Sequence, residues 1–227
     1  MHSVKFAIFP NYSFVDLGLY QFGCETCEAG HSFGPARRNH YLFHYVINGK
    51  GILYADDSDG HTNTFHVHSG EGFMIFPGQV NTYVADMSNP WEYTWLEFDG
   101  LRVKQALETA GFSQEQPIYM PQSHELSDNL KSEMLQIVNH SDASQFHLIG
   151  HLYMFMDYLT RSALNTRTGK NITNRLICTV KVNQNIAAVF VSGKLFRNIA
   201  FPYTTRSRSG YLGQQQRDGP SAQAVAR

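Results

Sequence analysis

Cysteine is scarce in this sequence, with three among 227 residues. So few cysteines exclude a disulfide-stapled scaffold and favour a reducing compartment, and we expect a cytoplasmic protein. No apolar run reaches the ~18 residues that a membrane-spanning helix needs. The first apolar segment is interrupted by Pro10 and Asn11, which does not fit a signal peptide. We therefore expect no membrane partner, and regard the glycosylation sequons at Asn11, Asn139 and Asn171 as chance matches.

Charge is also scarce, because only 16% of the residues are charged while 42% are hydrophobic. This balance excludes a disordered chain and a charge-rich coiled coil. The net charge of -1 conceals an asymmetry, since residues 175–227 carry eight Lys or Arg and a single acid, Asp218. A basic tail can bind nucleic acid. The alternative is that this tail is not a native folded segment.

Short β-branched and aromatic segments fill the chain from Tyr41 to Phe98, and turn residues separate them. The segments are 41–47, 52–54, 62–68, 73–76, 80–85 and 91–98. Closely spaced strands with Gly, Asp and Pro between them predict an antiparallel barrel or sandwich.

The period of the apolar residues changes to that of helices after Gly100. The stripes are Val103, Ala106, Leu107 and Ala110, then Leu126, Leu130, Met134, Ile137 and Val138, then Phe146, Ile149, Leu152, Tyr153, Met156 and Leu159. We expect these faces to pack on the barrel, on a second copy, or on both. Residues 166–174 are polar and predict a linker, and residues 204–227 have the composition of disorder.

Three segments carry a family resemblance. They are His31–Gly51 (HSFGPARRNHYLFHYVINGKG), Gly70–Gly78 (GEGFMIFPG) and Pro90–Gly100 (PWEYTWLEFDG). In their order and spacing, residues 15–165 resemble the effector-binding half of AraC/XylS-type bacterial transcription regulators, especially those tied to sugar use. The resemblance implies a mainly β fold with C-terminal α: a cupin-like (jelly-roll) antiparallel β-barrel followed by an antiparallel helical dimerisation segment.

The resemblance for residues 1–165, and composition for the rest, predict the division of the chain. Residues 1–100 would form the effector-binding barrel with an N-terminal arm, residues 101–165 the helical dimerisation segment, and residues 166–227 a linker and a disordered basic tail. Residues 175–227 show no helix, short Gly turn and second helix in succession. DNA contact is therefore expected only through a helix-turn-helix domain not recognisable in this chain. A shifted reading frame is one hypothesis for this tail.

The last predicted strand provides the main candidate site. Because side chains alternate along a strand, Trp91, Tyr93 and Trp95 share one face with Glu97 next in line, and Tyr83 on the preceding strand would face the same cavity. Aromatic rings stack on the C–H faces of sugars, and a carboxylate accepts hydrogen bonds from hydroxyls. The alternative is that the rings fill the barrel. The resemblance implies effector contacts on this strand.

Basic residues flank the first strand of this region. Arg37, Arg38 and His40 precede it, and Arg38 is our candidate for a forked contact with sugar hydroxyls or a carboxylate. The alternative is a solvated surface pair. His44 shares a face with apolar neighbours and is expected to point into the barrel, either as a ligand contact or as a core residue.

A metal site is the alternative use of the barrel. His66 and His68, followed by Glu71, nearly match the metal-binding cupin motif and would project from one strand face. The spacing from His68 to Glu71 is too short and the later His of the motif is missing. Phe65 and Val67 also give the opposite face the better claim to the core.

Cys24 and Cys27 have the spacing of redox or zinc pairs, but no second pair exists, and Cys178 lies alone in the tail. We expect the pair to be structural. No glycine-rich phosphate loop and no Ser/His/Asp set is recognisable.

The sequence therefore predicts a sensor that binds a small effector, a sugar or sugar derivative, without a cofactor and without catalysis. Effector binding would order Gly30–Asn39 over the ligand and alter the pairing of a homodimer through helices 123–165. Two alternatives stay open. One is a metal-dependent cupin enzyme using His66 and His68, and the other is a dimerisation module with a filled barrel.

Overall fold

The computed structural model describes residues 2–9, 14–163, 179–183, 186–191 and 194–196. The chain divides into two compact units, Met1–Lys170 and Asn171–Arg227. Within the described residues, none of the helices combines the length and the apolar character needed to cross a membrane.

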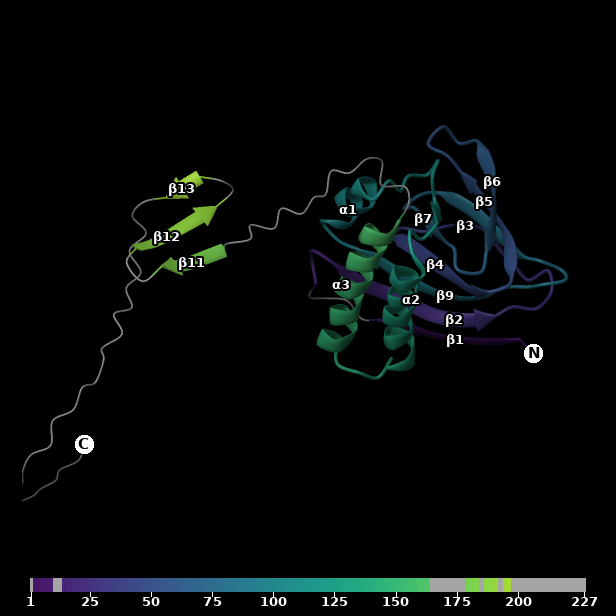
Figure 1. Ribbon diagram of the computed structural model, residues 1–227. Coiled ribbons are helices and arrows are strands. Elements are labelled where there is room, and N and C mark those ends of the chain that lie inside the picture. The colour runs from purple at the N-terminus through teal and green to yellow at the C-terminus, as the bar shows by residue number, and fades with distance from the viewer. Residues whose placement is uncertain (1, 10–13, 164–178, 184–185, 192–193, 197–227) are drawn as a thin grey trace, which may run out of the picture. The chain divides into compact units, whose positions relative to one another are not determined.

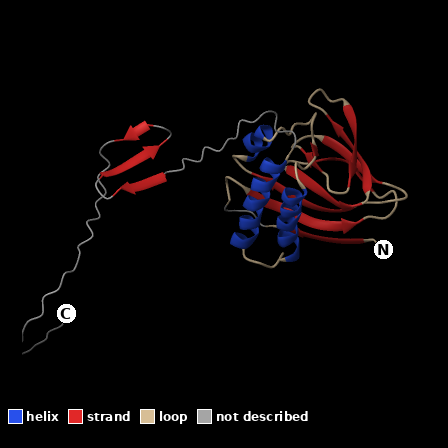
Figure 2. Cartoon of the chain, in the orientation of Figure 1, coloured by secondary structure: helices blue, strands red, loops and turns tan. Residues whose placement is uncertain are grey.

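Two antiparallel sheets build the first unit (Figures 1 and 2). The six-stranded sheet has the order β1 (Ser3–Ile8), β2 (Gly18–Thr26), β9 (Glu92–Asp99), β4 (Tyr41–Asn48), β7 (Gly72–Ile75) and β10 (Ile118–Tyr119). The four-stranded sheet has the order β3 (Ser32–Arg37), β8 (Val80–Ala85), β5 (Lys50–Asp56) and β6 (Thr62–His68).

The predicted mainly β, cupin-like architecture is confirmed, with one difference. Among the described residues the two sheets do not join into a continuous hydrogen-bonded barrel. An isolated parallel bridge pairs Lys50, at the start of β5, with Pro90, which lies just before β9. The sheets face each other instead, and side chains fill the space between them.

The helices follow the sheets in the chain, as the change of period predicted. They are α1 (Val103–Thr109), α2 (His124–Asn139) and α3 (Gln145–Ser162). Two serines cap the longer helices, because Ser123 accepts from the Leu126 N–H and Ser144 accepts from the His147 N–H. Helices α2 and α3 lie side by side on the outer face of the six-stranded sheet (Figure 1).

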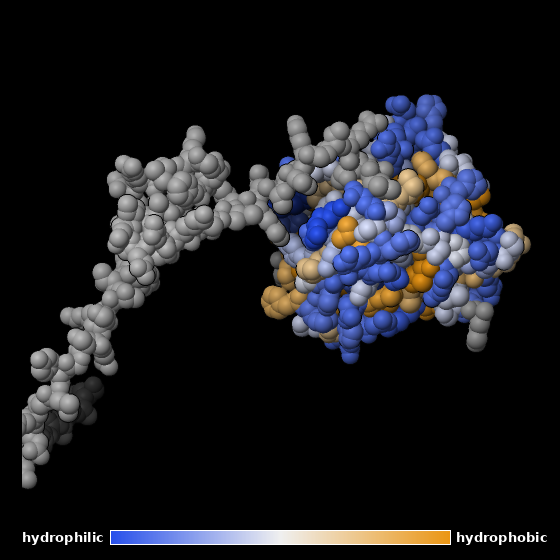
Figure 3. All heavy atoms as spheres, in the orientation of Figure 1, coloured by the Kyte–Doolittle hydropathy of each residue, from blue (hydrophilic) through white to orange (hydrophobic). Residues whose placement is uncertain are grey.

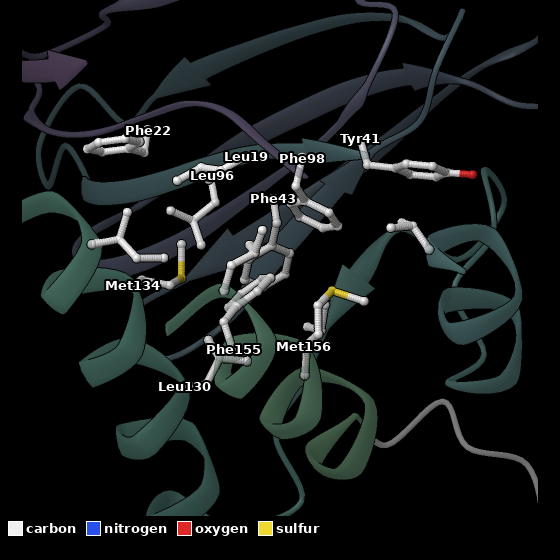
Figure 4. Close-up of a cluster of buried hydrophobic side chains, with 14 of the residues drawn as sticks. Leu19, Phe22, Tyr41, Phe43, Leu96, Phe98, Leu130, Met134, Phe155 and Met156 are labelled. Carbon is white, nitrogen blue, oxygen red and sulfur yellow. The ribbon is translucent and has the colours of Figure 1, made fainter. Parts of the chain in front are cut away.

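Alternation along β9 sends its side chains into two separate cores. Leu96 and Phe98 pack outward against the helices, whereas Tyr93 and Trp95 point between the two sheets. In the helical core the Phe155 ring lies 5.5 Å from Phe43 and 5.6 Å from Phe98 (Figure 4). One strand therefore forms a wall of both cores.

The buried stripe of α3 differs from the predicted one. Leu148 and Phe155 belong to it, while Phe146 is 82% exposed and Tyr153 is 45% exposed. The helix is rotated so that Phe146 and Tyr153, both predicted in the apolar stripe, lie off the sheet. The Tyr153 hydroxyl donates to Asp16 at the edge of the unit. Figure 3 shows a mostly hydrophilic surface on this unit, with hydrophobic residues in separate patches.

The second unit contains a three-stranded antiparallel sheet of β11 (Thr179–Asn183), β12 (Ile186–Val191) and β13 (Lys194–Phe196). These three strands lie within residues 166–227, for which a linker and a disordered basic tail stay the prediction. The predicted linker at residues 166–174 and the composition of residues 204–227 lie outside the described residues.

Candidate functional site

A pocket of about 170 Å³ opens between the two sheets, near the edge strand β1. Both sheets contribute to it. Its walls are Val4, Phe6, Gln21, Glu25, Phe33, Arg38, Leu42, His44, Tyr83, Tyr93 and Trp95. The pocket thus combines an aromatic wall with several polar groups, as small-molecule sites do.

Strand register brings the aromatic wall together. Trp95 pairs with His44 across β9 and β4, and with Gly23 across β9 and β2. A Cβ atom at Gly23 would lie 2.6 Å from the Trp95 ring and 2.3 Å from the Lys5 carbonyl oxygen. The missing side chain at Gly23 therefore leaves the room in which the Trp95 indole lies against the sheet.

His44 is the buried polar group at the base of the pocket. Its ring stacks on Phe73 at 4.5 Å, and its Nδ1 has no hydrogen-bond partner among the described residues. Burial, and secondarily the charge of Arg38, hold the pKa of His44 well below its usual 6.5. The imidazole is therefore neutral, and its Nδ1 is a buried ring nitrogen left without a hydrogen bond within the described residues.

Arg38 lies in the turn before β4 and reaches the pocket. An ion pair with Glu97 on β9 holds its guanidinium. Its Nη1 donates to Glu97 Oε2 at 3.1 Å, while His40 Nδ1 lies 3.1 Å from the other carboxylate oxygen. The guanidinium carbon lies 5.4 Å from the centre of the Phe33 ring. Its Nε has no hydrogen-bond partner among the described residues, so this N–H donor of the guanidinium is unused.

Glu25 is a pocket residue that the sequence reasoning missed. The Tyr93 hydroxyl donates to Glu25 Oε2 at 2.8 Å, and the carboxylate is buried. The two residues are register partners on β2 and β9. No strand was predicted before Tyr41, so the sequence could not assign Glu25 to a strand face. A polar residue in that segment was the available signal. Burial raises the pKa of both Tyr93 and Tyr83, which stay neutral phenols.

Five of the seven predicted ligand residues line the pocket and two do not. The five are Arg38, His44, Tyr83, Tyr93 and Trp95. Glu97 is not in the pocket wall, and its carboxylate forms an ion pair with the Arg38 guanidinium. Trp91 precedes β9 and is fully buried, with its ring 2.5 Å from where a Cβ at Gly51 would be. Trp91 therefore fills the interior, as the alternative expected, whereas Trp95 belongs to the same core and also lines the pocket.

The histidines of the metal alternative face away from the interior. His66 and His68 are exposed on β6, whereas Val67 between them is fully buried between the sheets. His68 Nδ1 lies 3.2 Å from Glu71 Oε2 on the surface. This pair cannot hold a cation inside the sheets, because the strand alternation that buries Val67 turns both imidazoles outward.

Cys24 and Cys27 are free thiols. Burial, and then the nearby Glu25 carboxylate, raise the pKa of Cys27 to about 12. A thiol with such a pKa is neither a nucleophile nor a ready metal ligand at neutral pH. Cys178 lies outside the described residues.

Comparison with known proteins connects this geometry to one family. The family model described as AraC-like ligand binding domain matches residues 18–156. The Msm operon regulatory protein of Streptococcus mutans is 28% identical over 147 residues, which are 62% of this chain and 49% of that protein. The raffinose operon transcriptional regulatory protein RafR of Pediococcus pentosaceus is 31% identical over 45% of this chain and 36% of its own length.

This chain therefore spans half or less of the length of these curated relatives. Solved structures are similar over part of the chain. The protein YhaK from Escherichia coli is 17% identical with a TM-score of 0.37, covering 43% of this chain and 45% of its own. A deletion mutant of Bacillus subtilis oxalate decarboxylase is 14% identical with a TM-score of 0.33, covering 48% and 34%.

Proposed function

This chain belongs to the AraC-like ligand binding domain family, and from that membership we propose that its pocket binds a sugar or sugar derivative as the sensing part of a bacterial transcription regulator. The printed names of two relatives, an Msm operon regulator and a raffinose operon regulator, support the carbohydrate class. Binding alone performs this function, and the pocket needs no catalytic group. We place this activity in the cytoplasm.

The observation that carries the proposal is the pairing of an aromatic wall with unused polar atoms. Trp95 offers a flat apolar face, while His44 Nδ1 and Arg38 Nε have no partners among the described residues. A sugar ring has apolar C–H faces and a rim of hydroxyls. Buried polar atoms without partners are costly, and ligand hydroxyls would satisfy them.

The size of the pocket limits the occupant. Its volume of about 170 Å³ is below the ~300–1,000 Å³ of sites for drug-sized molecules. One sugar ring is the expected guest inside it, and further rings of a longer saccharide would extend past Val4 and Phe6, both exposed on β1.

The signal would travel through β3 and β9. The segment Gly30–Asn39 includes the strand β3 and holds Phe33 and Arg38 in the pocket wall, so ligand contact would favour one position of this segment over the pocket. On β9, Trp95 faces the pocket and Leu96 faces the helices. A ligand that prefers one position of β9 would therefore bias the helices.

We propose a homodimer through helices 123–165. Phe146 and Tyr153 support it, because these large side chains are exposed on α3. DNA contact would require a helix-turn-helix domain that is not recognisable in this chain.

A thermal-shift panel of mono- and oligosaccharides tests the proposal. A sugar at 100 times its Kd should stabilise the wild type by about 2.7 kcal/mol, a shift of roughly 5–10 °C for a unit of this size. Trp95→Ala and Arg38→Lys should abolish or strongly reduce that shift, and Leu101→Ala, at an exposed site outside the pocket and the proposed dimer helices, should retain it. No shift with any sugar, or equal shifts in all variants, would favour a dimerisation module without a ligand.

A further inference from the structure

Three side chains from separate segments converge beside the pocket, and sugar binding does not require their convergence. His2 precedes β1, Glu25 lies on β2 and His31 immediately precedes β3. His2 Nε2 lies 2.6 Å from Glu25 Oε1, and His31 Nε2 lies 3.2 Å from the same oxygen. One ligand atom from each residue lies within 4.8 Å of those of the other two.

We propose that His2, Glu25 and His31 form a zinc-binding site at the rim of the pocket. Two imidazoles and one carboxylate are a donor set that Zn²⁺ accepts, with a fourth position left for water or another ligand. Imidazole and carboxylate together suit Zn²⁺ better than the hard cations Ca²⁺ and Mg²⁺, which take oxygen ligands.

The two distances from Glu25 Oε1 require only a small rearrangement to fit a zinc ion. Bonds of ~2.0–2.1 Å in a tetrahedral site separate ligand atoms by about 3.3 Å. The 3.2 Å between His31 and Glu25 already meets this value. The 2.6 Å between His2 and Glu25 would open by less than about 1 Å, and the His2 side chain is 38% exposed and able to turn.

The supporting groups hold two of the three donors in place. The His31 N–H donates to the Glu28 carbonyl at 3.0 Å, and the His31 carbonyl accepts from the Ala85 N–H at 2.8 Å. The Tyr93 hydroxyl donates to Glu25 Oε2, the carboxylate oxygen that neither histidine approaches. A hydrogen bond of this kind orients a metal-ligating carboxylate.

A zinc ion there would connect β1, β2 and the start of β3. Strand β1 is the edge of its sheet and carries Val4 and Phe6 of the pocket wall. Because the ion would bind only when the three segments are in place, it would stabilise the folded unit by mass action. The proposed zinc site shares Glu25 with the pocket wall, but its test is separate from that of the sugar proposal, since zinc binding is measured with no sugar present.

The test is calorimetric titration of ZnCl₂ into the full chain after removal of metal with a chelator. The wild type should bind one equivalent at the tightest site, and zinc should raise the melting temperature. His2→Ala and His31→Ala should each weaken this binding by at least tenfold and remove the thermal shift. Tyr93→Phe should keep the stoichiometry and weaken binding by about tenfold.

Two matched variants control for other histidines. His66→Ala removes an exposed imidazole of β6, and His151→Ala removes one that lies 2.6 Å from Glu133 and 4.6 Å from the His147 ring. Both should bind zinc as the wild type does. The proposal is overturned if zinc binds no tighter to the wild type than to His2→Ala, or if His151→Ala loses the site. If His31→Ala does not fold, the zinc affinity of His2→Ala decides the proposal, because His2 is exposed.

Discussion

At the scale of single residues, two tryptophans on one face of the chain have different surroundings. Trp91 is packed over Gly51, while Trp95 lies over Gly23 and lines the pocket. Alternation predicts the shared face, since it depends only on the strand backbone. The depth at which each ring lies depends on the partner strand and on which of its residues lack a Cβ.

Gly23→Ala is expected to lower the free energy of unfolding by about 1–3 kcal/mol, because overpacking forces neighbours to move. The added methyl would meet the Lys5 carbonyl, a backbone atom, at 2.3 Å. Gly150→Ala on α3 is the control. Nothing lies within 4 Å of its new Cβ, so helix propensity should stabilise the unit by about 0.5–1 kcal/mol. Urea unfolding of the two variants checks the contrast, and equal effects would contradict it.

His44 predicts a pH dependence of stability. Its folded-state pKa lies well below the usual 6.5 because of burial. As the pH falls below about 6.5, the unfolded chain takes up a proton that the folded chain does not. Stability is therefore lost with falling pH, by up to about 1.4 kcal/mol per pH unit until the folded pKa is reached.

His44→Gln should remove this part of the pH dependence, measured by urea unfolding between pH 7.5 and 5 as the difference from the wild type. The exposed His61 provides the control, since His61→Gln should retain the wild-type slope. Parallel curves for the wild type and His44→Gln would show that His44 does not titrate in this way.

At the scale of elements, β9 has one face toward the pocket between the sheets and the other toward the helices. Tyr93 and Trp95 belong to the core between the sheets, and Leu96 and Phe98 to the core under α2 and α3. The strand is central in its sheet, with β2 and β4 on either side. A displacement of β9 would therefore change both cores together, which is the physical basis of the proposed coupling between the pocket and the helices.

Helix α3 contains a pair of phenylalanines that tests its orientation. Phe155 is fully buried against Phe43 and Phe98, so Phe155→Ala should cost about 3–5 kcal/mol of unfolding free energy. Phe146→Ala should change the stability of the monomer by less than about 0.5 kcal/mol, because the ring is exposed. Denaturant unfolding at low protein concentration distinguishes them. A large loss for Phe146→Ala would indicate that the helix is rotated from the orientation described.

At the scale of the whole molecule, the sheets and the helices form one unit, because the larger core contains residues of both. A chain ending at Lys170 should therefore unfold at the same urea concentration as the full chain. A chain ending at Asn139 should not fold, since it lacks the fully buried Leu152, Phe155 and Leu159. Circular dichroism with urea checks both. A large loss of stability in the longer fragment would show that residues 171–227 support the first unit.

Much of the fold was predictable from local pattern. Turn residues bounded the strands from Tyr41 to Phe98, and the change of period located α1, α2 and α3. The stripe of α3 was predicted less well, because Phe146 and Tyr153 fit a helical period without lying on the sheet. Periodicity indicates that a helix has a face, but contact with the sheet decides which apolar residues that face includes.

The sequence by itself determined which side chains of β9 share a face and that His66 and His68 oppose Val67, because these follow from the two-residue repeat of a strand. Only the tertiary structure decided that Trp91 is core, that Glu97 holds Arg38, and that Glu25 joins the pocket. Each of those outcomes depends on strand register and on the closeness of segments far apart in the chain. No local periodicity contains that information, since it arises from pairing between strands and from packing of the two sheets.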